Sequence, residues 1–179
     1  MNKTLLALTL GLTSSAALAN TGSINFYGQV HAGTCPIVII DPVSNTPAAR
    51  IKMGNVNVSE FKVVGDEAAL RTFGMRVTPG NGCTVTQGSS ATVTFTGAYG
   101  AAGTGSALYA LEPGGAKNLA LIIKDDEGTQ VNNGTPSKGY PLDDTDPTTM
   151  IFSAAYKSVG AGVSAGAANT DVQFLVDIP

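Results

Sequence analysis

The side chains with the clearest chemical potential are a single histidine and two clusters of carboxylates. By spacing alone His31 leaves a Ser-His-Asp arrangement open, but nothing marks a nucleophile elbow, and a surface histidine is the simpler interpretation. Asp125-Asp126-Glu127 and Asp143-Asp144-Asp146 carry oxygen ligands of the kind that calcium prefers. Neither cluster has the spacing of an EF-hand loop, and acidic turns between strands are common. We therefore expect no enzyme activity, no metal site and no cofactor.

The first residues indicate export. Lys3 is followed by the uncharged apolar run Leu5–Leu12 and by Ala17-Leu18-Ala19, the small-residue pattern of a cleavage site. A buried helix or a membrane anchor is the alternative, but the run is shorter than the about 20 residues that span a bilayer. We expect residues 1–19 to be a signal peptide, with a mature chain from Asn20 to Pro179.

Two cysteines, Cys35 and Cys83, remain in the expected mature chain. An exported chain folds in an oxidising compartment, which favours a Cys35–Cys83 disulfide over two free buried thiols. Such a bridge would tie an early segment to one near the middle of the chain.

The elements that position these residues are predicted to be strands. Charged residues make up 13% of the chain, well below the usual quarter, whereas there are 22 glycines and no tryptophan. The expected mature chain has nine basic and thirteen acidic side chains, a net charge of −4 that makes nucleic acid an unsuitable partner. This composition is typical of a weakly charged all-β protein with many turns.

Short alternating or apolar runs, separated by Gly and Pro clusters, follow one another along the chain. Their spacing predicts a single immunoglobulin-like β-sandwich. Glu67–Leu70 could form a short turn of helix, and Ser44–Glu67 has no clear assignment. The expected strands cover Pro36–Ile40, Phe73–Val77, Thr92–Thr96, Leu108–Leu111, Asn118–Lys124, Thr149–Tyr156 and Val172–Ile178.

The segment Gly22–Val30 alternates like a strand although it directly follows the expected cleavage site. Large apolar side chains on one side of an N-terminal tail require a groove in which to lie. At about 3.3 Å per residue, Thr21–His31 would reach roughly 33 Å, the length of a sandwich. The segment could therefore pair within its own domain or with a neighbouring molecule.

Several motifs occur together, in an order that resembles the major pilins of type 1 and P-pilus chaperone–usher fimbriae. The resemblance extends over the whole expected mature chain. It rests on Gly22-x-Ile24-x-Phe26-x-Gly28-x-Val30 before Cys35, on Val93-x-Phe95-x-Gly97, on Leu119–Ile123 before Asp125 and Gly128, on Phe152-x-Ala154-x-Tyr156, and on Val163–Ala168 before Val172-x-Phe174-x-Val176.

The resemblance implies an immunoglobulin-like domain at residues 32–179 that lacks its last strand, completed by a donor strand from the neighbouring subunit. The extension at residues 20–31 would be that donor strand for the next subunit. A periplasmic chaperone would fill the groove first and an outer-membrane usher would exchange it, placing the subunit in a fimbria at the cell surface. The residues implied are Ile24, Phe26, Gly28 and Val30 in the donor strand, and Val172, Phe174, Val176 and Ile178 in the C-terminal strand that faces the groove and the chaperone. The groove would be lined near Ile37–Ile40 and Val172–Ile178.

One feature departs from the family pattern. Family members commonly have a tyrosine next to the last residue, whereas this chain ends in Ile178-Pro179. The alternation of Phe174, Val176 and Ile178 is kept, so an apolar strand still ends the chain.

Two alternatives remain open. The first is a secreted carbohydrate-binding or adhesin-like module, whose sugar platform would use the five tyrosines, Tyr27, Tyr99, Tyr109, Tyr140 and Tyr156. Family tip adhesins carry a separate lectin domain, for which this chain has no room. The second is a monomeric secreted sandwich whose N-terminal strand completes its own fold.

Overall fold

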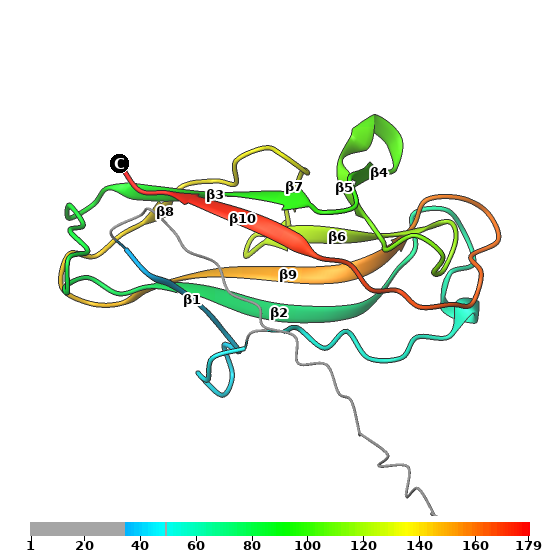
Figure 1. Ribbon diagram of the computed structural model, residues 1–179, viewed down its shortest axis with the longest axis horizontal. Coiled ribbons are helices and arrows are strands. Elements are labelled where there is room, and N and C mark those ends of the chain that lie inside the picture. Colours follow the sequence, from blue (N-terminus) through cyan, green and yellow to red (C-terminus); the bar gives the residue numbers. More distant parts are fainter. Residues whose placement is uncertain (1–34, 49) are drawn as a thin grey trace, which may run out of the picture. The chain divides into compact units, whose positions relative to one another are not determined.

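Strands are the main regular elements of the structure, a computed structural model that describes residues 35–48 and 50–179 (Figure 1). These residues belong to one compact unit, Gly33–Pro179. The expected signal peptide, the donor segment with Ile24, Phe26, Gly28 and Val30, and His31 all lie outside the described residues.

The larger sheet has seven strands, and every pairing within it is antiparallel. The path β1-β2-β9-β6-β5-β4 gives its order, and β7 pairs with β6 on the side of that path. Its strands are β1 (Ile37–Ile40), β2 (Glu67–Val77), β4 (Ala101–Ala102), β5 (Leu108–Ala110), β6 (Leu119–Asp125), β7 (Gln130–Val131) and β9 (Thr148–Ser158).

The smaller sheet has three strands in the order β10-β3-β8: β10 (Val172–Asp177), β3 (Ser90–Gly97) and β8 (Tyr140–Pro141). Figure 1 shows β3 and β10 as one layer and β2, β9 and β6 as the other. In the part of the chain that the structure describes, helix is confined to two short 3₁₀ turns, η1 (Val58–Glu60) and η2 (Thr104–Ser106). Within residues 35–48 and 50–179, neither turn approaches the length or apolar character of a membrane-crossing helix.

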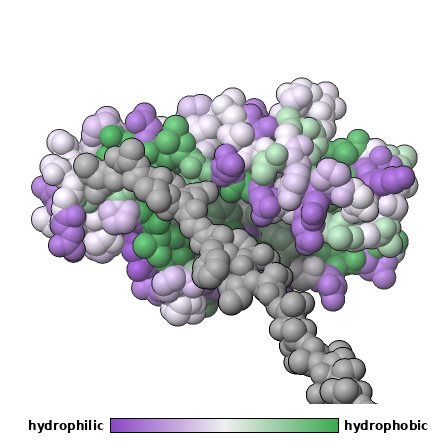
Figure 2. Space-filling model, in the orientation of Figure 1, coloured by the Kyte–Doolittle hydropathy of each residue, from purple (hydrophilic) through white to green (hydrophobic). Residues whose placement is uncertain are grey.

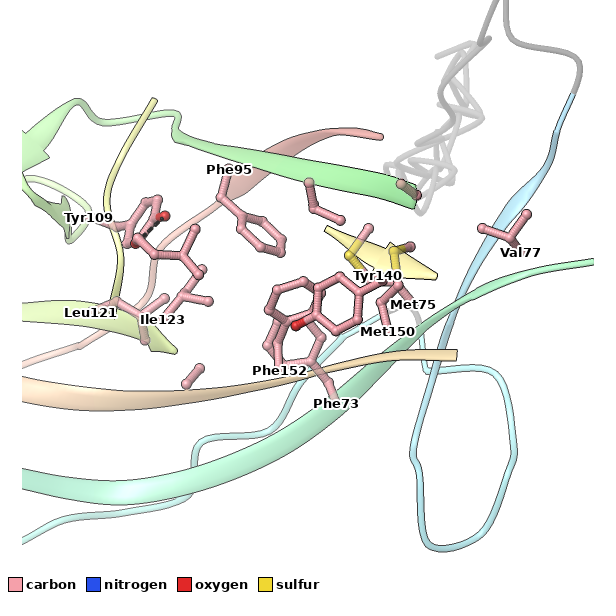
Figure 3. Close-up of a cluster of buried hydrophobic side chains, with 14 of the residues drawn as sticks. Phe73, Met75, Val77, Phe95, Tyr109, Leu121, Ile123, Tyr140, Met150 and Phe152 are labelled. Atoms are coloured by element: carbon pink, nitrogen blue, oxygen red, sulfur yellow. Dashed lines mark hydrogen bonds between the residues drawn. The ribbon is translucent and has the colours of Figure 1, made fainter. Parts of the chain in front are cut away.

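Aromatic rings join the two sheets at the centre of the core (Figure 3). Phe152 on β9 is fully buried, and its ring stacks on Phe73 of β2 with centroids 5.7 Å apart. From the opposite sheet, Phe95 of β3 meets Phe152 edge-on at 5.0 Å. Tyr140 of β8 approaches the same ring at 5.3 Å, so each sheet contributes two rings to the cluster. The fold is therefore the all-β, immunoglobulin-like sandwich that the sequence predicts.

The expected helical turn at Glu67–Leu70 is wrong. Those residues begin β2, where Glu67 pairs with Lys157 and Ala68 with Tyr156. A β-bulge then shifts the register before Arg71, with Ala69 in the left-handed region at φ 60°. Pairing with the long strand β9 overrides the local helical preference, and the bulge re-aims the strand.

Candidate functional site

The inward face of β10 carries an apolar row that is only half-buried. Val172, Phe174 and Val176, with Ile178 just after the strand, pack against the core cluster, while Gln173, Leu175 and Asp177 point outward and are exposed. The paired residues of β3 differ sharply, since Val93 is 0% and Phe95 3% exposed. Among the described residues β10 ends the order of its sheet, and its inward row is less buried than the row of β3 beside it.

A second half-buried row lies on β1, which ends the order of the larger sheet as far as the described residues show it. Ile37 and Ile39 pack against the core, opposite Val77 and Met75 of β2. Ile40 faces the other way and is buried close to Gly74, with 2% of its surface exposed. Of the expected lining at Ile37–Ile40, the alternation therefore turns two residues toward the core.

The chain after β1 folds back and then runs on without joining a strand. The Ala48 amide donates to the Ile39 carbonyl at 2.9 Å, so this return covers the end of β1. Further on, Met53, Val56 and Phe61 are half-buried and pack against the core. They come from the stretch that the sequence leaves unassigned, because they lack period-two alternation.

We call the half-buried inward residues of β10, of β1 and of this stretch the apolar strip. Its members are Ile37, Ile39, Met53, Val56, Phe61, Val172, Phe174, Val176 and Ile178. A cavity of about 480 Å³ adjoins it, with Val56, Phe61, Leu119 and Tyr156 among its lining residues. Figure 2 shows hydrophobic residues on the face that Figure 1 presents, beside more hydrophilic surroundings. A surface of this character can take an additional apolar strand.

The disulfide expected from the cysteine count is present between Cys35 and Cys83. Cys83 is buried in a tight turn, where the Gly80 and Cys83 amides donate to each other's carbonyls at 2.9 and 3.0 Å. Cys35 directly precedes Pro36 and β1. The bridge therefore fastens the start of β1, one wall of the apolar strip, to the core.

The acidic clusters serve turns. Asp125 is 5% exposed, and its Oδ1 accepts hydrogen bonds from the Glu127 and Thr129 amides. Asp143 is half-buried and accepts hydrogen bonds from the amides of Asp146 and Thr145. Those backbone bonds, with the Thr145 hydroxyl, lower the pKa of Asp143 to about 2. Both carboxylates are thus committed to local backbone, as the simpler interpretation predicts.

The described tyrosines do not form a sugar platform, so this part of the alternative is wrong. Tyr109 is fully buried, and burial raises its pKa; its hydroxyl donates to the Val131 carbonyl at 3.0 Å. Tyr140 and Tyr156 are also buried, with hydroxyls donating to the Ile151 and Ala168 carbonyls. Among the described tyrosines Tyr99 alone is exposed, at 38%.

Contrary to the expectation that nothing marks a nucleophile elbow, one serine has the glycine spacing of that motif, in the run Gly162-Val163-Ser164-Ala165-Gly166. The structural context that the motif requires is a strand-to-helix turn. Here Ser164 lies in an irregular loop, and its hydroxyl accepts a hydrogen bond from the Lys117 amide at 2.9 Å. The spacing is therefore used for loop packing in this chain.

The face of β2, β6 and β9 that bears charged side chains carries a small ion-pair network. Lys124 and Lys157 flank Glu67 at 2.5 and 3.1 Å. Partial burial would raise the pKa of Glu67, but hydrogen bonds and the charges of the two lysines outweigh it and lower the pKa. The three groups satisfy one another and tie the three strands together.

The comparisons with known proteins point to one family. The profile of the family described as "Fimbrial protein" matches residues 24–179. The probable major fimbrial subunit LpfA of Escherichia coli O157:H7 is 29% identical over 180 residues, which cover 97% of this chain and 95% of that protein. The major MR/P fimbria protein of Proteus mirabilis is 30% identical over 154 residues, or 80% of this chain and 79% of that protein.

A solved structure of similar fold comes from a chaperone–usher fibre. The P pilus rod subunit PapA superposes with a TM-score of 0.60 at 21% identity, over 82% of this chain and 100% of that one. At this low sequence identity the similarity supports only the fold, and the fold agrees with the family match. Since that match spans most of the sequence, the chain belongs to the fimbrial protein family, as a fimbrial subunit of the chaperone–usher type.

Proposed function

We propose that this protein is the structural subunit of a surface filament and that it polymerises by donor-strand exchange. In this scheme the extension at residues 20–31 of one subunit lies along the apolar strip of the next. Ile24, Phe26 and Val30 would fill the strip, and Gly28 would sit where the groove is shallow. The filament would support adhesion or biofilm formation.

The observation that carries the proposal is the uneven burial of two paired strands. Val93 on β3 is 0% exposed, whereas Val176, its partner on β10, is only half-buried although it also faces the core. The same contrast holds for Phe95 and Phe174. An additional strand beside β10 would bury the inward row of β10 as fully as the inward row of β3 is buried now.

The energies favour such a complement. Burying Ile24, Phe26 and Val30 would stabilise the assembly by roughly 1.5–3 kcal/mol each. Each added backbone hydrogen bond contributes on the order of 0.5–1.5 kcal/mol net. The extension of one subunit would fill the strip of another, a head-to-tail contact that uses two different surfaces, so the assembly stays open and grows into a filament.

Before assembly the strip needs a temporary cover, because an uncovered apolar edge aggregates. We propose that a periplasmic chaperone provides a strand beside Val172–Ile178 and that an outer-membrane usher exchanges it. The exported chain would thus pass through the periplasm to the cell surface. The Ile178-Pro179 end, in place of the usual penultimate tyrosine, would bear on which chaperone recognises this subunit.

The first test compares surface-sheared filaments of the intact protein with those of a form lacking residues 21–31, by SDS gel electrophoresis with and without boiling. Donor-strand exchange predicts a ladder for the intact protein that collapses on boiling and is lost on deletion. A single monomer band in every lane would contradict the proposal and favour the monomeric sandwich.

A matched pair of substitutions on β10 tests the apolar strip itself. Val176→Asn puts a polar amide on the inward row, where it should reduce filament yield, because the donor strand would bury that amide. Leu175→Asn is the control, since Leu175 points outward and is 67% exposed. Equal filament yield from both variants would remove the strip from the assembly contact. In the donor segment, Gly28→Leu should block polymerisation and leave chaperone binding intact.

A further inference from the structure

The sequence holds two Asn-Gly pairs, Asn81-Gly82 and Asn133-Gly134, and the fold treats them differently. Asparagine before glycine is the most reactive context for deamidation, because glycine has no side chain to hinder its own amide nitrogen. The reaction needs a free glycine nitrogen and a mobile asparagine side chain. These two requirements can be checked at each pair.

At the first pair both requirements are met. Asn81 and Gly82 form the exposed tip of the turn between Gly80 and Cys83. Within the described residues, neither the Asn81 side chain nor the Gly82 amide makes a hydrogen bond. A Cβ placed on Gly82 would meet no atom within 4 Å, so the space around this residue is open. Two backbone hydrogen bonds close the turn, and local opening of such a tip costs little.

At the second pair the fold holds all the reacting groups. The Gly134 amide donates to the Phe95 carbonyl at 2.7 Å, which ties the nitrogen that would attack. Oδ1 of Asn133 accepts from the Gly97 amide at 3.0 Å, which fixes the side chain that would be attacked. The Asn133 amide donates to the Ala107 carbonyl at 3.0 Å. These bonds anchor the turn to β3 and to the start of β5.

We propose that Asn81 is a deamidation site of the folded protein and that Asn133 is protected by its hydrogen bonds. The Gly82 nitrogen attacks Cγ of Asn81, forming a C–N bond and a succinimide, while its proton and the side-chain NH₂ leave as ammonia. One water then opens the ring at either carbonyl. The product is aspartate, or isoaspartate with the chain running through the former side chain.

Either product changes this turn. Aspartate adds one negative charge at the tip, and isoaspartate adds a backbone carbon to a two-residue turn whose closing hydrogen bonds join Gly80 and Cys83. Cys83 is also one end of the disulfide that fastens β1. Modification of Asn81 therefore changes the structure next to one wall of the apolar strip. Because the modified form accumulates with time, its fraction would report how long a fimbrial subunit has been exposed.

The test incubates the folded, oxidised mature protein at mildly alkaline pH and follows both sites by peptide mass spectrometry. Cleavage after Arg76 and Lys117, following reduction, releases a peptide in which Asn81 is the sole asparagine. Cleavage after Lys124 and Lys138 releases the peptide with Asn133. Asn81→Asp supplies the authentic product, and the reduced, urea-unfolded chain is the reference in which both Asn-Gly pairs are free.

In the folded protein we expect Asn81 to deamidate about tenfold faster than Asn133, a ratio that corresponds to about 1.4 kcal/mol of extra opening free energy at Asn133. In the unfolded chain the two rates should converge. Equal rates in the folded protein, or faster reaction at Asn133, would overturn the proposal. The proposal would also be overturned if folding slowed the reaction at Asn81 as much as it slows the reaction at Asn133, since the turn would then protect Asn81 as well.

Discussion

Replacing Phe152 with alanine should destabilise the sandwich more than any other single truncation of an aromatic residue in it. Phe152 is fully buried and contacts three rings, Phe73 beside it and Phe95 and Tyr140 across the core. Truncating a core phenylalanine costs about 3–5 kcal/mol. That is a large part of the about 5–15 kcal/mol that holds a typical domain folded.

Urea unfolding of the mature chain, followed by circular dichroism, measures this cost as a shift in midpoint. Phe61→Ala is the matched control, because Phe61 is half-buried beside the cavity and is absent from the ring cluster. We expect Phe61→Ala to cost well under half as much as Phe152→Ala. If the two variants unfold at the same urea concentration, the ring cluster is not what joins the two sheets.

A double-mutant cycle isolates the contact between the sheets. Phe152→Leu and Phe95→Leu each keep an apolar side chain but lose the edge-to-face geometry, whose centroids lie 5.0 Å apart. Aromatic pairs contribute about 0.5–1.5 kcal/mol beyond the area they bury. We therefore expect the two substitutions to be non-additive by about that amount. Strict additivity would refute a specific ring–ring contribution across the core.

Three further changes test other parts of the fold. Removing the disulfide by Cys35→Ala with Cys83→Ala should cost about 4 kcal/mol by the chain-entropy estimate, read from urea unfolding; the bridge spans 48 residues. Gly97→Ala should cost about 1–3 kcal/mol, because its Cβ would lie 2.7 Å from the Gly100 carbonyl oxygen; an unchanged midpoint would contradict this. The pKa of Asp143 is lowered from 3.8 to about 2, so the stability it adds is present above pH 3.8 and lost as pH falls through about 2. Asp143→Asn should flatten the fall in melting temperature in that window, and an unchanged fall would argue against it.

Period-two alternation accounts for most of what the sequence predicts correctly. β3, β9 and β10 have inward rows of large apolar residues, and each lies within a residue or two of its expected range. On one side of each strand these large side chains meet the main core, and this produces the period-two alternation in the sequence. The two-residue strands β7 and β8 are too short to carry such a pattern.

The start of β2 and the stretch around Met53 and Val56 were beyond sequence analysis for a different reason. At Ala69 a bulge breaks the alternation, so the residues before it no longer match the period of those after it. Met53 and Val56 are three apart and belong to no strand, yet both pack on the core. Their burial depends on tertiary contacts that local spacing does not record.

The Val93-x-Phe95-x-Gly97 motif acquires a physical explanation from the structure. Val93 and Phe95 are inward and at most 3% exposed, and Gly97 stands where the next turn brings a backbone carbonyl too close for a side chain. The motif thus combines two core positions with one steric limit. A sequence pattern alone shows the spacing of the three residues but not which of them is limited by space.

The alternation on β10 is as regular as that on β3, and the two strands are paired residue for residue from Val172 opposite Gly97 to Asp177 opposite Thr92. Alternation reports which face of a strand meets the core, but it does not report whether a further strand covers it. The difference appears in the burial, where Val176 stays half-exposed beside a fully buried Val93. A sandwich complete in itself would not leave its last inward row at that level, because burying the row would stabilise the fold at little cost in chain entropy. The extension at residues 20–31 carries a matching alternation in the sequence, and under the donor-strand exchange that we propose it would bury this row on another subunit.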